Sequence, residues 1–481
     1  MIRVLHSVSN MDRAGIETML MNYYRHMDHE KVQFDFLCNK TKPGAYDEEI
    51  KQMGGYIFHT PGLNPAKYLQ YLKYMKKLFE KWNSISLILR IVCGLVIGVI
   101  LGLVVPQATG IAILGDVFVG ALKAIAPLLV FFLLISALCH AGKSHGGIIK
   151  TVIIMYMFST FLAALVAVIA SRLFPVTLTL ADAATDMAAP DGIVEVLKTL
   201  LMNMVANPVS SLLNANYIGV LTWGVIIGVG MRAANDTTKK VLDDISNGLS
   251  QVVSWIISMA PFGILGLVFS SISSNGLEIF SEYGKLLLVL VGSMLFIYFV
   301  TNPIIVFWCI RKNPYPLIFK CLKKSAITAF FTRSSAANIP VNMKACEEWG
   351  MDKDTYSVTI PLGATINMDG AAITITVMTL AAANTLGIHV DFLSGIVLSI
   401  LATLAACGAS GVAGGSLLLI PMACSLFGIS NDIAMQIVGV GFIIGVIQDS
   451  VETALNSSSD LLLSASAEFR QWRLEGKEIK Y

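Results

Sequence analysis

The sequence has few charged residues. Of its 481 residues, 14% are Asp, Glu, Lys or Arg, whereas 55% are hydrophobic, and the mean hydropathy is +0.70. These values exclude an ordinary soluble globular protein and predict a protein embedded in the lipid bilayer. The formal net charge is only +2, and the basic residues form short clusters. We therefore expect no nucleic-acid partner.

Paired cysteine motifs are also missing, and the sequence predicts no N-terminal signal peptide. The eight cysteines include no Cys-x-x-Cys pair, and most of them lie in apolar runs. Such cysteines usually pack as small hydrophobic side chains, so metal binding and disulfide formation are the weaker interpretations. The opening stretch MIRVLHSVSNMDRAG is too polar to be a signal peptide, and we expect none.

The composition changes near residue 80. Before this point, short apolar runs of strand length at 2–8, 32–38 and 55–60 alternate with stretches long enough for helices at 15–27, 45–53 and 66–79. This alternation predicts the beginning of a doubly wound parallel sheet. Residues 1–80 are therefore predicted to form a small α/β, partly Rossmann-like fragment.

Long apolar segments dominate the chain after residue 80. Residues 81–310 are predicted to form six conventional membrane helices, at 85–105, 117–139, 152–171, 212–231, 252–271 and 286–310. Most Lys and Arg residues of the connecting loops, and those of the tail at 471–481, then fall on the same side as residue 80. By the positive-inside rule, both termini are predicted to be cytoplasmic in a multi-pass plasma or inner membrane protein.

Residues 311–470 have a different pattern, with two segments too polar to cross the bilayer as ordinary helices. The segment 316–344 carries TRSSAANIP at its centre, and the segment 391–428 carries CGASGVAGG. Each is predicted to be a re-entrant hairpin, two helices joined by a small polar tip. Two such hairpins, each beside a broken helix, indicate a transporter site near the middle of the bilayer.

A carboxylate interrupts the apolar run at 358–383, within the stretch GATINMDGAAITI. Asn367 and Gly370 favour local unwinding of a helix there, and the freed carbonyls would join Asp369 in an oxygen-rich site. A carboxylate in a bilayer needs such a partner. Sodium is the favoured cation, and protons are the alternative. A further alternative is that Asp369 only caps the broken helix or pairs with Arg333.

The stretch QDSVETALNSSSD, at residues 448–460, aligns polar side chains along one helix face. That face would carry Asp449, Glu452, Thr453, Asn456 and Asp460. Three carboxylates on one face inside a membrane indicate bound cations, because the neighbouring residues are apolar. The alternative is a solvated helix leaving the bilayer.

Four motifs follow one another in the chain: TRSSAANIP, GATINMDGAA, CGASGVAGG and QDSVETALNSSSD. Their order resembles the dicarboxylate/amino acid:cation symporter family, and their residues most resemble its serine/threonine:sodium symporter branch. The resemblance covers about residues 83–473. It implies an all-α polytopic membrane protein with eight transmembrane helices and two re-entrant helical hairpins, assembled as a homotrimer. It also implies helices 1–6 within 81–310, and hairpin 1, helix 7, hairpin 2 and helix 8 within 311–470. A mobile transport domain would move substrate as an elevator.

The resemblance also implies site residues. Substrate contacts would fall on Arg333 (through its backbone), Ser334, Ser335, Met368, Gly411, Val412, Gly414, Asp449, Glu452, Thr453 and Asn456. One sodium ion would use Gly363, Asn367, Asn456 and Asp460. A second would use Tyr156, Ser159, Thr160, Asn367 and Asp369. A third would use Thr365 with backbone oxygens of Ala406, Cys407 and Ala409.

Glu452 stands where members that carry acidic substrates have an arginine. A buried carboxylate there would repel aspartate and glutamate, so serine and threonine are the expected substrates. The alternative is a sodium- or proton-coupled symporter of dicarboxylates or acidic amino acids. An intramembrane hydrolase using Asp369 and Asp449 lacks a defined motif, and a passive channel is a further alternative.

Residues 1–80 resemble the N-terminal part of a GT-B glycosyltransferase, through MIRVLHSVSNMDRAGIETML and the strands that follow. The sequence departs from that pattern at Ala14, where the family usually has glycine. Nothing downstream resembles the domain that binds the nucleotide sugar. We therefore expect no glycosyl transfer and predict a transporter and not an enzyme.

Overall fold

The computed structural model describes residues 2–59, 84–139, 147–180, 193–408 and 414–479. Contacts within the chain divide it into two units, Met1–Ser86 and Leu87–Tyr481, each of which is described by itself. The division lies six residues beyond the boundary expected at residue 80.

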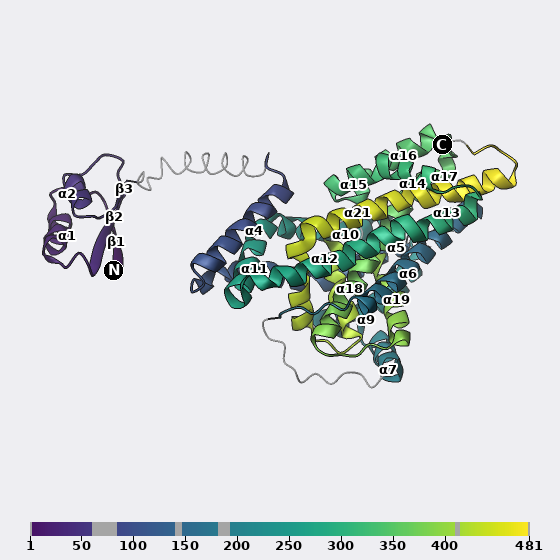
Figure 1. The fold of residues 1–481 in the computed structure, drawn as a ribbon, viewed down its shortest axis with the longest axis horizontal. Helices are drawn as coiled ribbons and strands as arrows, with labels where there is room; N and C mark the ends of the chain where they lie inside the picture. The colour runs from purple at the N-terminus through teal and green to yellow at the C-terminus, as the bar shows by residue number, and fades with distance from the viewer. Residues whose placement is uncertain (1, 60–83, 140–146, 181–192, 409–413, 480–481) are drawn as a thin grey trace. The chain divides into compact units, whose positions relative to one another are not determined.

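The N-terminal unit contains a small parallel sheet (Figure 1). Its elements are β1 (Ile2–Val8), α1 (Gly15–His26), β2 (Val32–Cys38), α2 (Asp47–Gln52) and β3 (Ile57–His59). The strand order is β1-β2-β3, and both strand pairs are parallel. Met21, Tyr24, Phe36 and Ile50 form its buried centre. The helix predicted at 66–79 lies outside the described residues.

The second unit is mostly helical. Its first part contains α4 (Leu87–Val104), α5 (Ile113–Cys139), α6 (Gly147–Leu173), α7 (Ile193–Met204), α8 (Pro208–Leu213), α9 (Tyr217–Gly230), α10 (Asp236–Ser258), α11 (Ala260–Asn275) and α12 (Ile279–Phe296). A π-helical turn, η4 (Ile297–Thr301), joins α12 to α13 (Asn302–Ile310).

Six stretches among the described residues are long and apolar enough to cross a membrane. They are Leu87–Val104, Thr109–Cys139, Gly147–Leu173, Ala260–Ile310, Lys353–Thr385 and Asn431–Leu474. Their lengths fit the requirement of about 20 apolar residues for a spanning helix. The chain is therefore a multi-pass helical membrane protein.

The predicted membrane helix at 252–271 is not one continuous helix. The structure breaks it at Met259, between α10 and α11. Pro261 lacks an amide proton and is tolerated here because it occupies the first turn of α11. Helix α11 packs closely on α4, where a Cβ on Gly94 would lie 2.1 Å from the Pro261 carbonyl oxygen. The break therefore lies where two helix backbones meet.

The segment predicted as the first hairpin folds as helix, turn and helix. It contains α14 (Tyr315–Cys321), the π-helical turn η5 (Leu322–Ala326), α15 (Ile327–Thr332) and α16 (Ser335–Glu348). Arg333 turns the chain with a left-handed φ of 52°, and Ser334 caps α16 by accepting a hydrogen bond from the Ala337 amide. The tip is thus a sharp turn made by the motif TRSSAANIP.

The second predicted hairpin begins with α19 (Phe392–Ala406) and continues beyond its tip with η6 (Gly415–Leu419) and α20 (Ile420–Ser425). Between the hairpins lies a helix interrupted after Ile366, which forms α17 (Lys353–Ile366) and α18 (Asp369–Thr385). The final helix, α21 (Asn431–Leu474), extends four residues beyond the expected end of the membrane part at residue 470.

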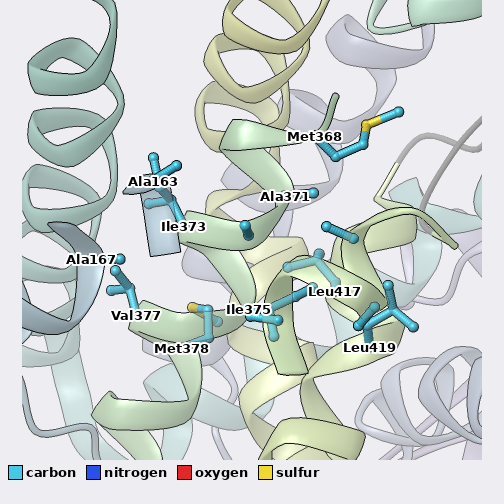
Figure 2. Packing of buried hydrophobic residues seen from close by; sticks show 14 of the residues in the cluster. Ala163, Ala167, Met368, Ala371, Ile373, Ile375, Val377, Met378, Leu417 and Leu419 are labelled. Atoms are coloured by element: carbon cyan, nitrogen blue, oxygen red, sulfur yellow. The ribbon is translucent and has the colours of Figure 1, made fainter. Parts of the chain in front are cut away.

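Helix α18 lies at the centre of this unit and is buried on all sides from Asp369 to Ala383. Figure 2 shows Ala163 and Ala167 on α6 and several large apolar side chains on α18 and η6. Small residues on α6 let it approach α18 closely, because they have little volume between the two backbones. The interrupted helix is therefore held in protein, where its freed backbone groups can be satisfied.

Candidate substrate and cation site

The site is built around the interruption between α17 and α18. Asn367 (φ −95°, ψ 80°) and Met368 (φ −119°, ψ 53°) leave the helical conformation. Asn367 and Asp369 are both fully buried. A buried carboxylate requires partners, and the surrounding elements supply them.

Asp460 of α21 lies against the interruption. The side-chain amide of Asn367 donates to the Asp460 carboxylate at 2.9 Å and to the Ser459 hydroxyl at 2.7 Å. Asp460 Oδ2 and Asn367 Oδ1 are buried and have no partner within the described structure. Buried oxygen atoms that lack a hydrogen-bond partner are the ligands that a hard cation prefers.

Gly363 and Tyr156 close the same space. The Tyr156 hydroxyl donates to the Asp460 carbonyl oxygen at 3.0 Å and to the Thr359 carbonyl oxygen at 3.2 Å. A Cβ on Gly363 would lie 2.8 Å from both Asp460 Oδ1 and the Tyr156 oxygen. Glycine is therefore required for this close approach. Tyr156 borders the Asp460 site here, whereas it was expected in the set around Asp369.

Asp369 is held by α6. Ser159 donates to Asp369 Oδ2 at 2.8 Å, and Thr160 donates to Asp369 Oδ1 at 3.1 Å. All three residues are fully buried. The alternative that Asp369 pairs with Arg333 is wrong, since Arg333 pairs with Asp449. Hydrogen bonds from α6 fix the Asp369 carboxylate next to the interruption.

Asn302 belongs to this group and was not among the predicted residues. Its side-chain oxygen accepts a hydrogen bond from Ser159 at 3.2 Å, and its Nδ2 is buried without a partner in the described structure. Asn302 follows the π turn η4 and is the first residue of α13. A polar Asn-Pro pair in the middle of the apolar run 286–310 is the sequence signal from which Asn302 would have been found.

The third predicted cation set is described only in part. The Thr365 hydroxyl donates to the Leu362 carbonyl oxygen at 2.7 Å. The Cys407 thiol contacts the Ile366 carbonyl oxygen at 3.8 Å, which places the end of α19 beside the end of α17, and Ala406 is buried next to it. Ala409 lies outside the described residues.

The tip of the first hairpin reaches α21 through Arg333. Its Nε lies 2.6 Å from Asp449 Oδ2, and the two side chains are only 11% and 5% exposed. The other Asp449 oxygen accepts a hydrogen bond from the Gly414 amide at 3.2 Å. Asp449 thus joins the two hairpins, and an ammonium group reaches it only by sharing or replacing these donors.

The first hairpin is also anchored below its tip. Asn338 of α16 donates to the hydroxyls of Ser325 and Ser457, each at 2.8 Å. Asn342 donates to the Ser457 carbonyl oxygen at 2.8 Å. These buried bonds hold Ser334 and Ser335, the first residues after the turn, at a fixed place beside α21.

Glu452 forms a second polar group on α21. One carboxylate oxygen accepts hydrogen bonds from Thr374 at 2.7 Å, Ser416 at 2.9 Å and Gln448 at 2.5 Å. Thr374 belongs to α18 and Ser416 to η6, so Glu452 connects three elements. The stripe on α21 is therefore buried in protein, and the alternative of a solvated helix face is wrong.

The remaining predicted substrate residues surround the same space. Asn456 accepts from the Gly370 amide at 2.7 Å, and its Nδ2 contacts the Met368 sulfur at 3.4 Å. Thr453 is 6% exposed on the same face of α21. Gly411 and Val412 lie outside the described residues.

The donors in this site are carboxylate, amide, hydroxyl and carbonyl oxygens. Over the described part of the chain, no group of three or more His, Cys, Asp or Glu side chains could hold a metal ion. Such oxygen-rich surroundings suit a hard cation and not a soft transition metal. A broken helix between two re-entrant hairpins is typical of secondary transporters.

Comparisons with known proteins agree. The sequence model of the sodium:dicarboxylate symporter family matches residues 87–468. The chain therefore belongs to the sodium:dicarboxylate symporter family, and it is a transporter and not an enzyme. Because the match begins at residue 87, it gives no support to the glycosyltransferase resemblance of the N-terminal unit.

Curated relatives cover the same part of the chain. A Streptococcus thermophilus protein named serine/threonine transporter SstT is 59% identical over 400 residues, which are 83% of this chain and 100% of the relative. Proteins of the same name from Streptococcus agalactiae and Bifidobacterium adolescentis are 60% and 56% identical. These alignments cover 82% and 85% of this chain, and 98% and 95% of the relatives.

Proposed function

We propose that this protein is a secondary active transporter in which sodium entering the cell drives the uptake of serine or threonine. The names of the relatives and the family support this substrate and this cation. The observation that carries the proposal is that Asp460 Oδ2 and Asn367 Oδ1 are both buried without a partner among the described residues, on two side chains that are hydrogen-bonded to each other at the helix interruption. A bound cation would satisfy both of them.

Sodium would bind at three places in this proposal. The first site uses Asp460 with Gly363, Asn367 and Asn456. The second uses Asp369 with Ser159, Thr160, Asn367 and, as an addition, Asn302. The third uses Thr365 with the carbonyl oxygens of Ala406, Cys407 and Ala409. Tyr156 closes the first site, which its hydrogen bond to the Asp460 carbonyl oxygen supports.

The substrate would lie between the hairpin tips. Its carboxylate would face the N-terminal end of α16, where Ser334, Ser335 and the backbone amides after Arg333 point toward an anion. Its ammonium would bind Asp449, in place of part of the contact that Arg333 now makes. Its side chain would face Glu452 and Thr453, and Met368, Gly411, Val412, Gly414 and Asn456 would complete the site.

Glu452 supports a small hydroxylated substrate. A buried carboxylate repels the second carboxylate of aspartate or glutamate, whereas it can accept a hydrogen bond from a hydroxyl group. The competing function, a sodium- or proton-coupled symporter of dicarboxylates or acidic amino acids, would place like charges together at this position.

The complete assembly in this proposal has eight transmembrane helices, two re-entrant hairpins and both termini in the cytoplasm. Three copies would form a homotrimer in the inner membrane, and each transport domain would move as an elevator. The N-terminal unit would be an inactive glycosyltransferase-like fragment. The unequal distribution of Lys and Arg between the two sides supports this orientation.

The experiment is uptake of labelled serine into proteoliposomes with an inward sodium gradient, compared with potassium or choline in its place. Unlabelled threonine, aspartate and glutamate serve as competitors. We expect sodium-dependent uptake that threonine blocks and aspartate leaves unchanged. Strong competition by aspartate would refute the substrate, and equal uptake without sodium would refute the coupling cation.

A further inference from the structure

A long apolar groove lies on the surface of the membrane unit, between α6 with the residues that follow it and α12. Its volume is about 990 Å³, and its walls include Leu173, Phe174, Leu288 and Phe296. These four side chains are 68%, 64%, 74% and 47% exposed. Large apolar side chains exposed on membrane-spanning helices face lipid, because the bilayer interior is apolar and their exposure to it carries no hydration cost.

The groove has one charged end. Among the described residues that line it, Lys285 is the one that carries a charge, and no ion pair within the described structure includes it. Ser293 also lines the groove, but its hydroxyl donates to the Val289 carbonyl oxygen at 2.7 Å. A single cation at one end of an apolar groove matches an anionic head group attached to an acyl chain.

The length of the groove fits one leaflet. Lys285 and Phe296 are 11 residues apart on one helix, which corresponds to about 16 Å at 1.5 Å per residue. The hydrocarbon core of a bilayer is about 30 Å thick, so each leaflet provides about half of this depth. A lipid with its phosphate at Lys285 would therefore extend its chain to the level of Phe296.

The end of the groove near Lys285 is held in place by hydrogen bonds. Thr179, in the segment after α6, donates its amide and its hydroxyl to the two carboxylate oxygens of Glu282, at 2.8 and 2.9 Å. These bonds tie the segment to the first turn of α12.

We propose that this groove binds one anionic phospholipid, with an acyl chain along α12 and the phosphate on Lys285. The site is distinct from the substrate and cation site, and it does not depend on which solute is transported. A second copy of the chain is the competing occupant, and the experiment distinguishes the two.

Gly292 provides the decisive variant. It lines the groove, and a Cβ built on it meets no atom within 4 Å, so Gly292→Leu adds a side chain to the groove without a clash. Gly284 is the matched control. It lies on the same helix with the same open surroundings but does not line the groove.

The measurement is native mass spectrometry of the full-length protein, purified in detergent and titrated with phosphatidylglycerol or phosphatidylethanolamine. We expect one phosphatidylglycerol per chain to bind wild type and Gly284→Leu, and at least tenfold weaker binding to Gly292→Leu. Lys285→Ala should weaken phosphatidylglycerol binding about fivefold and remove its preference over phosphatidylethanolamine, whereas Lys285→Arg should retain both.

Two results would overturn the proposal. One is equal phosphatidylglycerol binding by Gly292→Leu and Gly284→Leu, together with an unchanged lipid preference in Lys285→Ala. The other is a disulfide between two chains that carry a cysteine in place of Leu288, formed in membranes in high yield, because it would show that a second copy covers the groove.

Discussion

Replacing Gly363 with alanine tests the space around Asp460 directly. The added methyl carbon would lie 2.8 Å from both Asp460 Oδ1 and the Tyr156 hydroxyl oxygen. Cβ atoms in protein structures essentially never approach another heavy atom this closely. Neither neighbour can move freely, because Asn367 holds the carboxylate at 2.9 Å and the Tyr156 hydroxyl donates to two carbonyl oxygens. The methyl group therefore enters the volume that we assign to a sodium ion.

The size of the effect follows from the cost of overpacking. An extra methylene or methyl in a tightly packed interior costs about 1–3 kcal/mol. If this cost falls on the state that holds the ion, the sodium concentration for half-maximal uptake rises by about 5- to 150-fold, since about 1.4 kcal/mol is tenfold. Alanine also favours the helix over glycine by about 1 kcal/mol, so the variant should still fold.

The assay is the sodium dependence of serine uptake in proteoliposomes. Gly445→Ala is the control, because Gly445 lies in α21 and a Cβ there meets no atom within 4 Å. We expect Gly445→Ala to behave as wild type. A folded Gly363→Ala protein whose half-maximal sodium concentration stays within about twofold of wild type would refute the assignment of this space to sodium.

Three further predictions concern other parts of the protein. Asn302→Ala and Ser159→Ala each remove a hydrogen-bonding group next to Asp369, so the half-maximal sodium concentration should rise about tenfold in each variant. Thr376→Val serves as a buried control. Unchanged half-maximal sodium concentrations in Asn302→Ala and Ser159→Ala would contradict the role of Asn302. Glu452→Gln removes the buried negative charge, so aspartate should begin to compete with labelled serine, and continued exclusion of aspartate would show that another group sets the preference. In the N-terminal unit, hydrogen bonds to the Lys40 carbonyl oxygen and then to Asp47 raise the pKa of His59. The stabilising effect of these hydrogen bonds should be complete below about pH 6.5 and should fall as the pH rises through the raised pKa of His59. Limited proteolysis of this unit should therefore accelerate more between pH 6 and pH 8 in wild type than in His59→Gln. Equal acceleration in the two proteins would refute the link between His59 protonation and the stability of this unit.

The sequence predicted the parts of the site that lie in continuous motifs. The interruption at Asn367 and the stripe on α21 follow from residue types whose helical preferences and burial costs are known. The helix–turn–helix of the first hairpin follows in the same way from the small polar tip between two apolar segments.

Contacts between distant segments were beyond sequence reasoning. Arg333 and Asp449 are 116 residues apart, and either of them had several possible partners. Asn302 was missed because an Asn-Pro pair inside an apolar run is also compatible with an ordinary helix start. The break at Met259 was missed because both sides of it are apolar, and hydropathy cannot distinguish one spanning helix from two packed ones.

The π-helical turn at Ile297–Thr301 determines how Asn302 and α13 are rotated relative to the helix that precedes them. A π turn closes its hydrogen bonds over one residue more than an α-helix does, and such turns occur often at functional sites. Loss of one residue from this turn would restore the α-helical spacing and rotate everything that precedes it by about 100° relative to Asn302 and α13. Deletion of one residue from this turn should therefore separate Asn302 from Ser159, whereas substitutions that keep the length of the turn should leave the contact in place.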